Sequence, residues 1–356
     1  MKKPFSLNAQ NLPLAVTIAL FALMYGFGSV MYDGYFSWQV FLNLFVDNAF
    51  LCIVAIGMTF VILSGGIDLS VGSVVALATM IAASLLEFRH WNPWAVIALV
   101  LVLGALFGTV MGLLVHFFRI PAFIVTLGGM FLARGLCYLI SIDSISITEP
   151  TFTALSQARI NVGVGEISPS VIVALVFLAV AMFLAHYTNF GRTVYAIGGN
   201  ERSAELMGLP VARTKVLIYT LSSFCAAAGG LVFAFYMLSG YGLHAQGLEL
   251  DAIAATVIGG TLLTGGVGYV FGTLFGVLIL GQIQTLIMFD GSLSSWWTKI
   301  AIGALLCLFC LMQRGLESIR ERRKGTGGRI RRKRAPAPAS KTEVVAERDG
   351  PSRKAA

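Results

Sequence analysis

Few residues in this sequence have the types and spacing that chemistry requires, and glycine carries the clearest pattern. Cys307 and Cys310 have the C-x-x-C spacing of a metal or redox site, but the surrounding ALLCLFCLM is entirely apolar. That environment favours two small hydrophobic side chains in a helix. The four histidines have no metal-ligand spacing, and no G-x-x-x-x-G-K-[ST] phosphate-binding loop occurs. We therefore expect no catalytic residue, no metal site and no cofactor bound by this chain.

The glycine pattern consists of two similar stretches, LSGGIDLSVGS at 63–73 and LTGGVGYVFGT at 263–273. With an offset of 200 residues, both read L-[ST]-G-G-[IV]-x4-G-[ST]. A pair of glycines can break a helix, and a following Asp or Ser can cap the next one. The likeness indicates either an internal duplication, common in transport pathways, or shared tight-turn chemistry. The predicted helix-break and gating residues are Gly65, Gly66, Asp68, Ser70, Gly72, Gly265 and Gly266.

Asp68 has two interpretations, a helix cap and a substrate-path or gating residue. The second stretch has Gly268 at the equivalent position, so the turn alone does not require an acid. This difference favours a functional role beside the cap. Gly72 is expected to let a neighbouring helix approach closely.

A third stretch, FGRTVYAIGGNERSAELMGLPVARTKVLIY, contains a short helix signal. Asn200 is a good N-cap, Glu201 supplies favourable charge in the first turn, and Gly208 followed by Pro210 ends the helix. We expect this helix, between the hinge glycines Gly199 and Gly208, to expose Ala204, Leu206 and Met207. Exposed apolar side chains on a short helix indicate a partner that covers them.

The composition indicates that membrane-spanning helices position these residues. Hydrophobic residues make up 57% of the 356 and charged residues only 12%, which disfavours a soluble enzyme, a disordered chain and a nucleic-acid binder. About 20 apolar residues cross a bilayer. The sequence predicts an all-α, polytopic membrane protein with about ten spans, near 14–31, 47–64, 69–87, 93–117, 121–141, 169–188, 213–238, 251–265, 267–289 and 295–313.

Charge gives these spans a direction. Residues 314–356 carry 14 Lys and Arg against five Asp and Glu, whereas the preceding body is nearly neutral. The positive-inside rule places both termini and loop 189–212 in the cytoplasm, and loop 142–168, with a short helix near 151–158, outside. We expect a transmembrane domain over 1–315 and a basic, disordered cytoplasmic tail over 316–356.

GGIDLSVGS at 65–73, GGNERSAELMG at 198–208 and ELDAIAATVIGGTLLTGGVG at 249–268 resemble signature stretches of one family. This family comprises the permease subunits of ATP-binding-cassette importers for monosaccharides, the ribose/xylose/galactofuranose class. The resemblance covers about 10–315. Within the class, DNAFLCIVAIGMTFVILSGGIDLSVGS and DGSLSSWWTKIAIG are most similar to permeases for galactofuranose.

The resemblance implies a bacterial inner-membrane permease that works by alternating access. Its expected partners are a second permease, identical or different, a cytoplasmic ABC ATPase that binds ATP-Mg, a periplasmic sugar-binding protein and the monosaccharide itself. The helix at 200–208 would be the contact to the ATPase. Side chains with hydrogen-bonding groups or aromatic faces are candidates for the sugar path: Asn48, Thr59, Phe123, Gln282, Gln284 and Trp296.

Two alternatives remain open. The importer could carry another pentose, hexose or signalling furanose, or the chain could be a secondary sugar transporter that works alone. A secondary transporter needs an ionisable group at membrane depth. Arg134 is the one candidate, and a single arginine is weak support for a proton relay because an internal pairing or a snorkelling side chain would explain it better.

Overall fold

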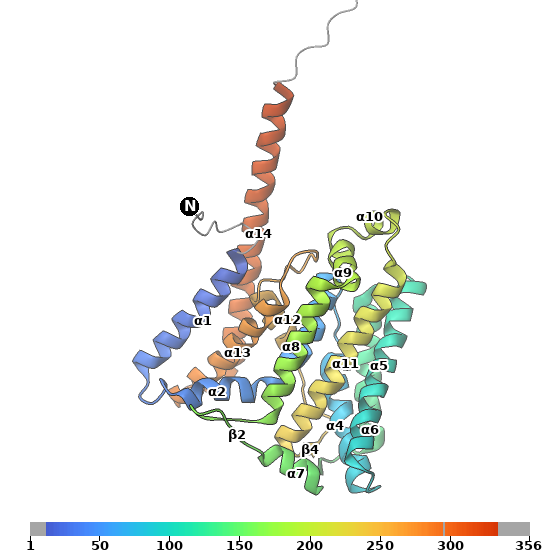
Figure 1. Ribbon diagram of the computed structural model, residues 1–356, viewed down its shortest axis with the longest axis vertical. Helices are drawn as coiled ribbons and strands as arrows, with labels where there is room; N and C mark the ends of the chain where they lie inside the picture. The colour runs from blue at the N-terminus through green and yellow to red at the C-terminus, as the bar shows by residue number, and fades with distance from the viewer. Residues whose placement is uncertain (1–11, 295, 334–356) are drawn as a thin grey trace, which may run out of the picture. The chain divides into compact units, whose positions relative to one another are not determined.

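The computed structural model describes residues 12–294 and 296–333, and within them the chain is almost entirely helical. The chain divides into two units, 1–311 and 312–356. The helices of the described residues, drawn in Figure 1, are α1 (Leu12–Met31), α2 (Trp38–Asp47), α3 (Ala49–Leu63), α4 (Val71–Glu87), α5 (Pro93–Phe117), α6 (Ala122–Ile140), α7 (Pro150–Gln157), α8 (Pro169–Tyr187), α9 (Asn189–Gly199), α10 (Glu201–Leu206), α11 (Val211–Met237), α12 (Leu248–Ile258), α13 (Val270–Asp290) and α14 (Trp296–Lys333).

Seven helices of the described part are long and apolar enough to cross a membrane: α1, α5, α6, α8, α11, α13 and α14. The pair α2 and α3 is bent by 54° at Asn48 and is either a broken span or a re-entrant loop, so the described residues contain seven spans, or eight if the pair crosses. The helix α4 is apolar but shorter, and α12 has only 11 residues. The chain is thus a polytopic membrane protein. Each of the ten expected segments contains a helix, but the expected span 251–265 is a half-length helix followed by a glycine-rich loop.

The first unit is built around α3 and α11. Every residue of α3 except Phe50 is buried, and α11 packs against α3, α4 and α5. Close packing of α5 on α11 depends on Gly104, Gly108 and Gly112, spaced four residues apart on one face of α5. A Cβ added at Gly112 would lie 2.7 Å from the Cα of Val216 on α11. Small residues at this spacing let helix backbones approach in a bilayer, where lipid supplies no hydrophobic driving force between helices.

The connection between α6 and α8 is organised at the end of the unit opposite α10 (Figure 1). It holds α7, the strand β1 (Ile145–Ser146), and the hairpin of β2 (Ile160–Asn161) and β3 (Glu166–Ile167). β1 pairs with β4 (Ser239–Gly240), which follows α11. The Glu87 carboxylate at the end of α4 accepts from the backbone N of Thr148 (2.6 Å) and of Glu149 (3.1 Å). The expected short helix near 151–158 is α7.

Within the described residues α14 continues to Lys333, into the first part of the basic segment 316–356 that is expected to be a tail. Residues such as Arg, Lys and Glu are good helix formers, and they dominate ESIRERRK after the last apolar residues of the span. The remainder of the expected tail, 334–356, lies outside the described residues.

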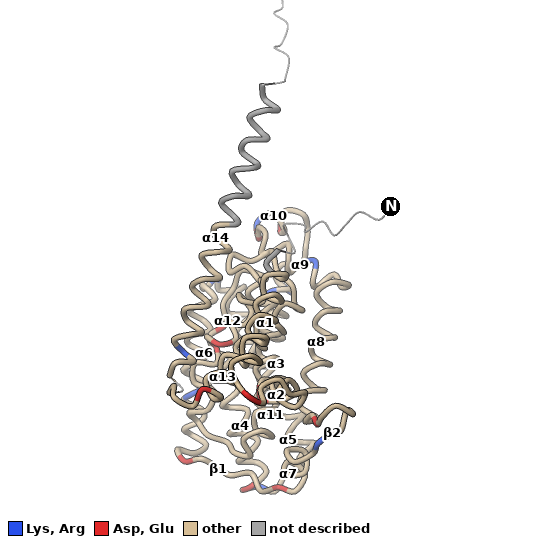
Figure 2. The backbone as a smooth tube through the Cα atoms, turned by 90° about the vertical axis from the view of Figure 1, so that its left-hand side faces the viewer, with Lys and Arg blue, Asp and Glu red and all other residues tan. Residues whose placement is uncertain are grey.

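The two ends of the first unit differ in charge (Figure 2). Lys and Arg positions on the backbone lie around α9 and α10, and Asp and Glu positions lie near β1 and α7. We refer to these as the α10 end and the α7 end.

Candidate functional site

Three glycine pairs from separate parts of the chain meet at the α10 end. They are Gly65–Gly66 after α3, Gly198–Gly199 at the end of α9, and Gly265–Gly266 between α12 and α13; we call this the glycine junction. The backbone N of Gly266 donates to the carbonyl of Leu63 (2.8 Å). A Cβ added at Gly265 would lie 2.7 Å from the N of Gly65 and 3.1 Å from the Cα of Gly198. No residue with a side chain fits these contacts, because the atoms in the way belong to backbone.

The junction links both helix breaks to the segment that carries α10. Tyr195 of α9 donates a hydrogen bond from its hydroxyl to the carbonyl of Gly268 (2.8 Å), in the second break. The hydroxyl of Tyr219 on α11 lies against Gly66 in the first break, 2.5 Å from where a Cβ would stand. A displacement of α9 would therefore be transmitted directly to the loops that end α3 and α12.

The short helix α10 has the caps that the sequence predicts. The Oδ1 of Asn200 accepts from the backbone N of Ser203 (2.8 Å), and Gly208 ends the helix at φ +76°. Leu206 and Met207 are exposed, at 82% and 69% of their surface. Glu201 forms an ion pair of 2.6 Å with Lys215 on α11.

One expectation about α10 is wrong. Ala204 is fully buried, in a cluster with Ile197 and Val211. The helix has fewer than two turns, so one of its faces must pack on α9 and the start of α11. Ala204 lies on that face, and it holds α10 in place rather than presenting a surface.

Asp68 is fully buried between α3 and α4. Its Oδ1 accepts from the backbone N (2.9 Å) and the hydroxyl (2.6 Å) of Ser70. Its Oδ2 accepts from the hydroxyl of Ser222 on α11 (2.7 Å). The carboxylate thus closes the turn before α4, as a cap does, and it also ties the first break to the centre of the bundle.

Two half-helices, α4 and α12, begin inside the bundle and run toward opposite ends (Figure 1). The carboxylate of Glu249, in the first turn of α12, lies against Gly72 in the first turn of α4. At Gly72 an added Cβ would also lie 2.7 Å from the carbonyl O of Ala245. The close approach expected at Gly72 is therefore made to the non-helical segment 241–247 and to α12. Two helix N-termini facing one carboxylate is an electrostatically favourable arrangement.

Arg134 holds the non-helical segment in place. Its guanidinium donates to the carbonyl oxygens of Gly242 (2.5 Å) and His244 (2.8 Å). Non-helical backbone at membrane depth needs such partners because lipid offers none. This is the internal pairing among the interpretations of Arg134, so the geometry does not require a proton relay at this residue.

Three of the six candidate path residues line one cavity of about 480 Å³, which we call the α13–α14 pocket. They are Asn48, Gln284 and Trp296. The pocket also contains an ion pair that the sequence analysis missed, between Lys299 Nζ and Asp251 Oδ2 (2.7 Å). Asp251 occupies the first turn of α12, and the signal for it was an acid within an apolar stretch expected to be a span.

The other three candidates lie elsewhere. Thr59 is fully buried and shares a hydrogen bond of 2.8 Å with Thr273, which joins α3 to α13. Gln282 is fully buried on α13. Phe123 is half exposed on the first turn of α6 and lines no part of this pocket. A polar or aromatic residue type does not reveal which face of a helix it occupies.

Comparison with known proteins gives a consistent set of relatives. The family described as "Branched-chain amino acid transport system / permease component" matches residues 40–310. The "Inner membrane ABC transporter permease protein YjfF" of Escherichia coli (strain K12) is 51% identical over 89% of this chain and 96% of its own length. The "Fructose import permease protein FruG" of Bifidobacterium longum (strain NCC 2705) is 38% identical, over 89% of this chain and 95% of its own.

The "Ribose import permease protein RbsC" of Escherichia coli (strain K12) is 37% identical over 80% of this chain and 88% of its own length. No solved structure matches the chain.

Proposed function

Because the chain belongs to the family of permease components that matches residues 40–310, we propose that it is the membrane-spanning subunit of an ATP-binding-cassette importer for a monosaccharide. Two relatives that cover most of its length are named as fructose and ribose import permeases, which favours a sugar over the amino acids in the family's description. The specific proposal is galactofuranose, on the strength of the sequence motifs. Another pentose, hexose or signalling furanose is the alternative.

The observation that carries the proposal is the pairing of an exposed apolar helix with the glycine junction. Leu206 and Met207 on α10 offer a contact surface to a cytoplasmic ATPase that binds ATP-Mg. The junction joins the same segment to both helix breaks through backbone contacts. Closure of the ATPase subunits would move α10, and α9 would pass the movement to α3 and α12. The chain itself performs no chemistry.

For the sugar path we propose two features, the α13–α14 pocket and the non-helical segment 241–247 that precedes α12. The non-helical segment 241–247 lies at the depth of Arg134, about two-thirds of the way along α6, and it is partly exposed there at Leu243 and Gln246. Exposed non-helical backbone at that depth suits a water-filled path and not lipid. Charged side chains at membrane depth also suit a water-filled path and not lipid, and the ion pair of Asp251 and Lys299 therefore supports the same proposal. A second permease, identical or different, would cover these two features.

In this proposal the α10 end and both termini lie in the cytoplasm of a bacterial cell, and the protein is in the inner membrane. The basic residues around α9 and α10 support the orientation through the positive-inside rule. The α7 end would then meet a periplasmic sugar-binding protein.

Uptake measurements test the proposal. Cells with and without the gene for this chain would be given labelled ribose, xylose, fructose, galactofuranose and, as a control for the family's description, leucine. We expect loss of the ATP-dependent uptake of one sugar and unchanged leucine uptake. Loss of leucine uptake alone would identify an amino acid importer. Sugar transport by the purified chain in liposomes without ATP would identify a secondary transporter.

A further inference from the structure

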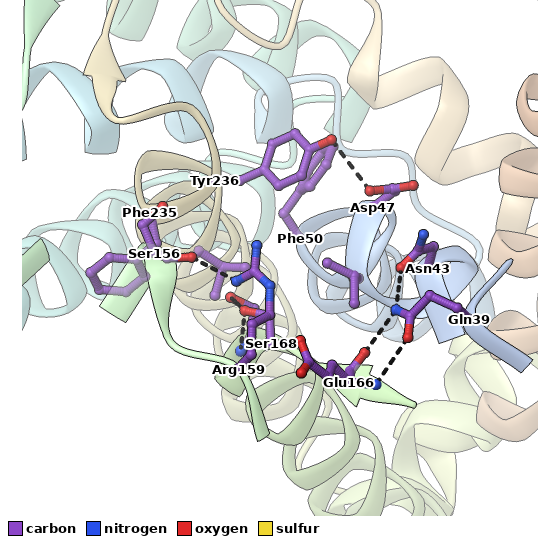
Figure 3. Close-up of a pocket in the computed structure, with 13 residues that line it drawn as sticks. Gln39, Asn43, Asp47, Phe50, Ser156, Arg159, Glu166, Ser168, Phe235 and Tyr236 are labelled. Atoms are coloured by element: carbon purple, nitrogen blue, oxygen red, sulfur yellow. Dashed lines mark hydrogen bonds between the residues drawn. The ribbon is translucent and has the colours of Figure 1, made fainter. Parts of the chain in front are cut away.

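A second polar cavity lies at the α7 end, between α2, α7, the β2–β3 hairpin and the end of α11. We call it the α2–α7 pocket; its volume is about 300 Å³, at the lower end of the range typical of small-molecule sites. The side chains that give it its character are Asn43, Asp47, Arg159 and Glu166, together with the rings of Phe50 and Tyr236 (Figure 3). None of these belongs to the candidate path residues.

The wall of this pocket is fixed by Gln39. Its amide accepts from the backbone N of Glu166 (3.0 Å), and donates to the carbonyl of Glu166 (3.0 Å) and to Oδ1 of Asn43 (2.9 Å). α2 is thereby fastened to β3, although the two are separated by more than a hundred residues of sequence. A pocket whose walls are joined in this way keeps its shape without a ligand, which reduces the entropy lost on binding.

Several polar groups of the pocket retain unused hydrogen-bonding capacity within the described residues. The Nδ2 of Asn43 has no protein acceptor, because only its Oδ1 is engaged. Tyr236 donates to Oδ1 of Asp47 (3.3 Å), which leaves Oδ2 free. One guanidinium nitrogen of Arg159 donates to the carbonyls of Ser156 (2.8 Å) and Ala158 (3.0 Å), which leaves its other N–H groups free. Figure 3 shows these groups around the rings of Tyr236 and Phe50.

This combination selects the chemistry of a ligand. Both free donors and free acceptors line the cavity, and each hydroxyl of a polyol can both donate and accept. The aromatic rings offer an apolar face to the C–H groups of a sugar ring. An anion would meet two carboxylates against one guanidinium. An apolar ligand would leave charged groups without partners. A neutral, polyhydroxylated ring satisfies all of these groups.

We propose that the α2–α7 pocket is a monosaccharide-binding site, separate from the α13–α14 pocket, where the sugar is held before it enters the path. The proposal rests on the proposed function for the identity of its ligand. Asp47 lines the α2–α7 pocket, and its neighbour Asn48 lines the α13–α14 pocket. The two pockets thus meet the chain at consecutive residues, where α2 and α3 join at the 54° bend.

Protection of a cysteine by sugar tests the site without relying on transport. Asn43→Cys in the otherwise unchanged chain, reconstituted in liposomes, would be labelled by a membrane-impermeant maleimide. D-ribose, D-fructose and D-galactose are the probes. Arg89→Cys, exposed at the same end, is the matched control, and the unchanged chain gives the background from the native cysteines. We expect at least one sugar to slow labelling at position 43 by about tenfold and to leave position 89 unaffected.

Labelling at position 43 that no sugar slows would overturn the proposal. Slowing by a sugar-free periplasmic binding protein, and not by free sugar, would identify the pocket as a docking contact and would also overturn it. Neither result depends on whether the chain imports a sugar, so failure of the site and failure of the proposed function are distinguishable.

A second variant measures the same site in the complete importer. Arg159→Gln removes the charge and shortens the side chain but keeps a polar group, and Arg89→Gln is its control. Since a hydrogen bond to a charged group contributes about tenfold or more to affinity, we expect the apparent KM for sugar uptake to rise about tenfold with little change in the maximal rate. An unchanged KM would contradict the assignment of Arg159.

Discussion

The two glycine breaks share the conformation of their first glycine, but only the second break has a left-handed second glycine, Gly266 at φ +75°, and the two breaks differ in their attachments. The equivalent residues Gly65 and Gly265 both adopt a left-handed conformation, with φ of +79° and +82°, and the helices that follow begin at equivalent positions within one residue. The first break is fastened to the bundle centre, through Asp68 and Ser222. The second is fastened to the segment bearing α10, through Tyr195 and Gly268. The glycine junction joins α9 to both breaks; we call the additional tie of the first break to Ser222 the anchor, and the additional tie of the second break to Tyr195 the moving connection.

The largest expected effect comes from a side chain at the second break. Gly265→Ala places a Cβ 2.7 Å from the backbone of Gly65 in addition to the strain of a positive φ. We expect the free energy of unfolding to fall by about 3 kcal/mol, from backbone strain and overpacking together. Gly65→Ala is the matched variant, since its Cβ has only one neighbour, the carbonyl of Thr264 at 3.6 Å. Thermal unfolding in detergent should show a much smaller loss for Gly65→Ala, and equal losses would contradict the contacts of the junction.

The anchor is tested by Asp68→Ala. The substitution leaves the buried hydroxyls of Ser70 and Ser222 without their acceptor. We expect the free energy of unfolding to fall by about 2 kcal/mol as a result. Ser222→Ala removes one of these bonds and should cost about half as much. If Asp68→Ala unfolds at the same temperature as the unchanged protein but abolishes uptake, Asp68 acts on the sugar or the gate and not as an anchor.

The moving connection is tested by Tyr195→Phe, which removes one hydrogen bond and keeps the ring. We expect stability to fall by about 1 kcal/mol, together with a reduced stimulation of ATP hydrolysis by sugar-loaded binding protein. Tyr187→Phe, an exposed tyrosine at the end of α8, is the control. Unchanged stimulation in Tyr195→Phe would show that the second break does not carry the signal.

The smallest effect is expected at the ion pair of Glu201 and Lys215, in which Glu201 is half exposed. Exposed pairs contribute about 0–1 kcal/mol, so Lys215→Gln should hardly change the unfolding temperature. The charge-reversing Glu201→Arg should instead lower coupled transport, because two cations would then face each other where α10 meets α11. Normal coupled transport by Glu201→Arg would show that the ion pair of Glu201 and Lys215 is not needed for coupling.

Sequence alone predicts the features that depend on residues adjacent along the chain. The breaks at Gly65–Gly66, the cap of Asn200 and the end of α10 at Gly208 all follow from local turn chemistry. The burial of Ala204 does not, because it depends on Ile197 and Val211 on adjacent elements. The sequence does not indicate that Gly198–Gly199 contacts both breaks. It also does not indicate that Asn48 and Gln284 line one pocket and that Thr59 lies outside it. Those outcomes depend on which helix faces meet, and hydrophobicity along an all-apolar helix such as α3 carries no facing signal.

In the proposed importer, α10 is the contact through which a separate ATPase drives this chain. The most direct measurement is gentle purification of the chain from its native host membrane, followed by identification of the proteins that accompany it. Leu206→Asp with Met207→Asp would be compared with the unchanged chain, and Val162→Asp, an exposed apolar residue of the β2–β3 hairpin, is the control. We expect an ATPase with a Walker A motif to accompany the unchanged chain and the control but not the double variant. A chain that purifies alone, or a double variant that retains the ATPase, would contradict it.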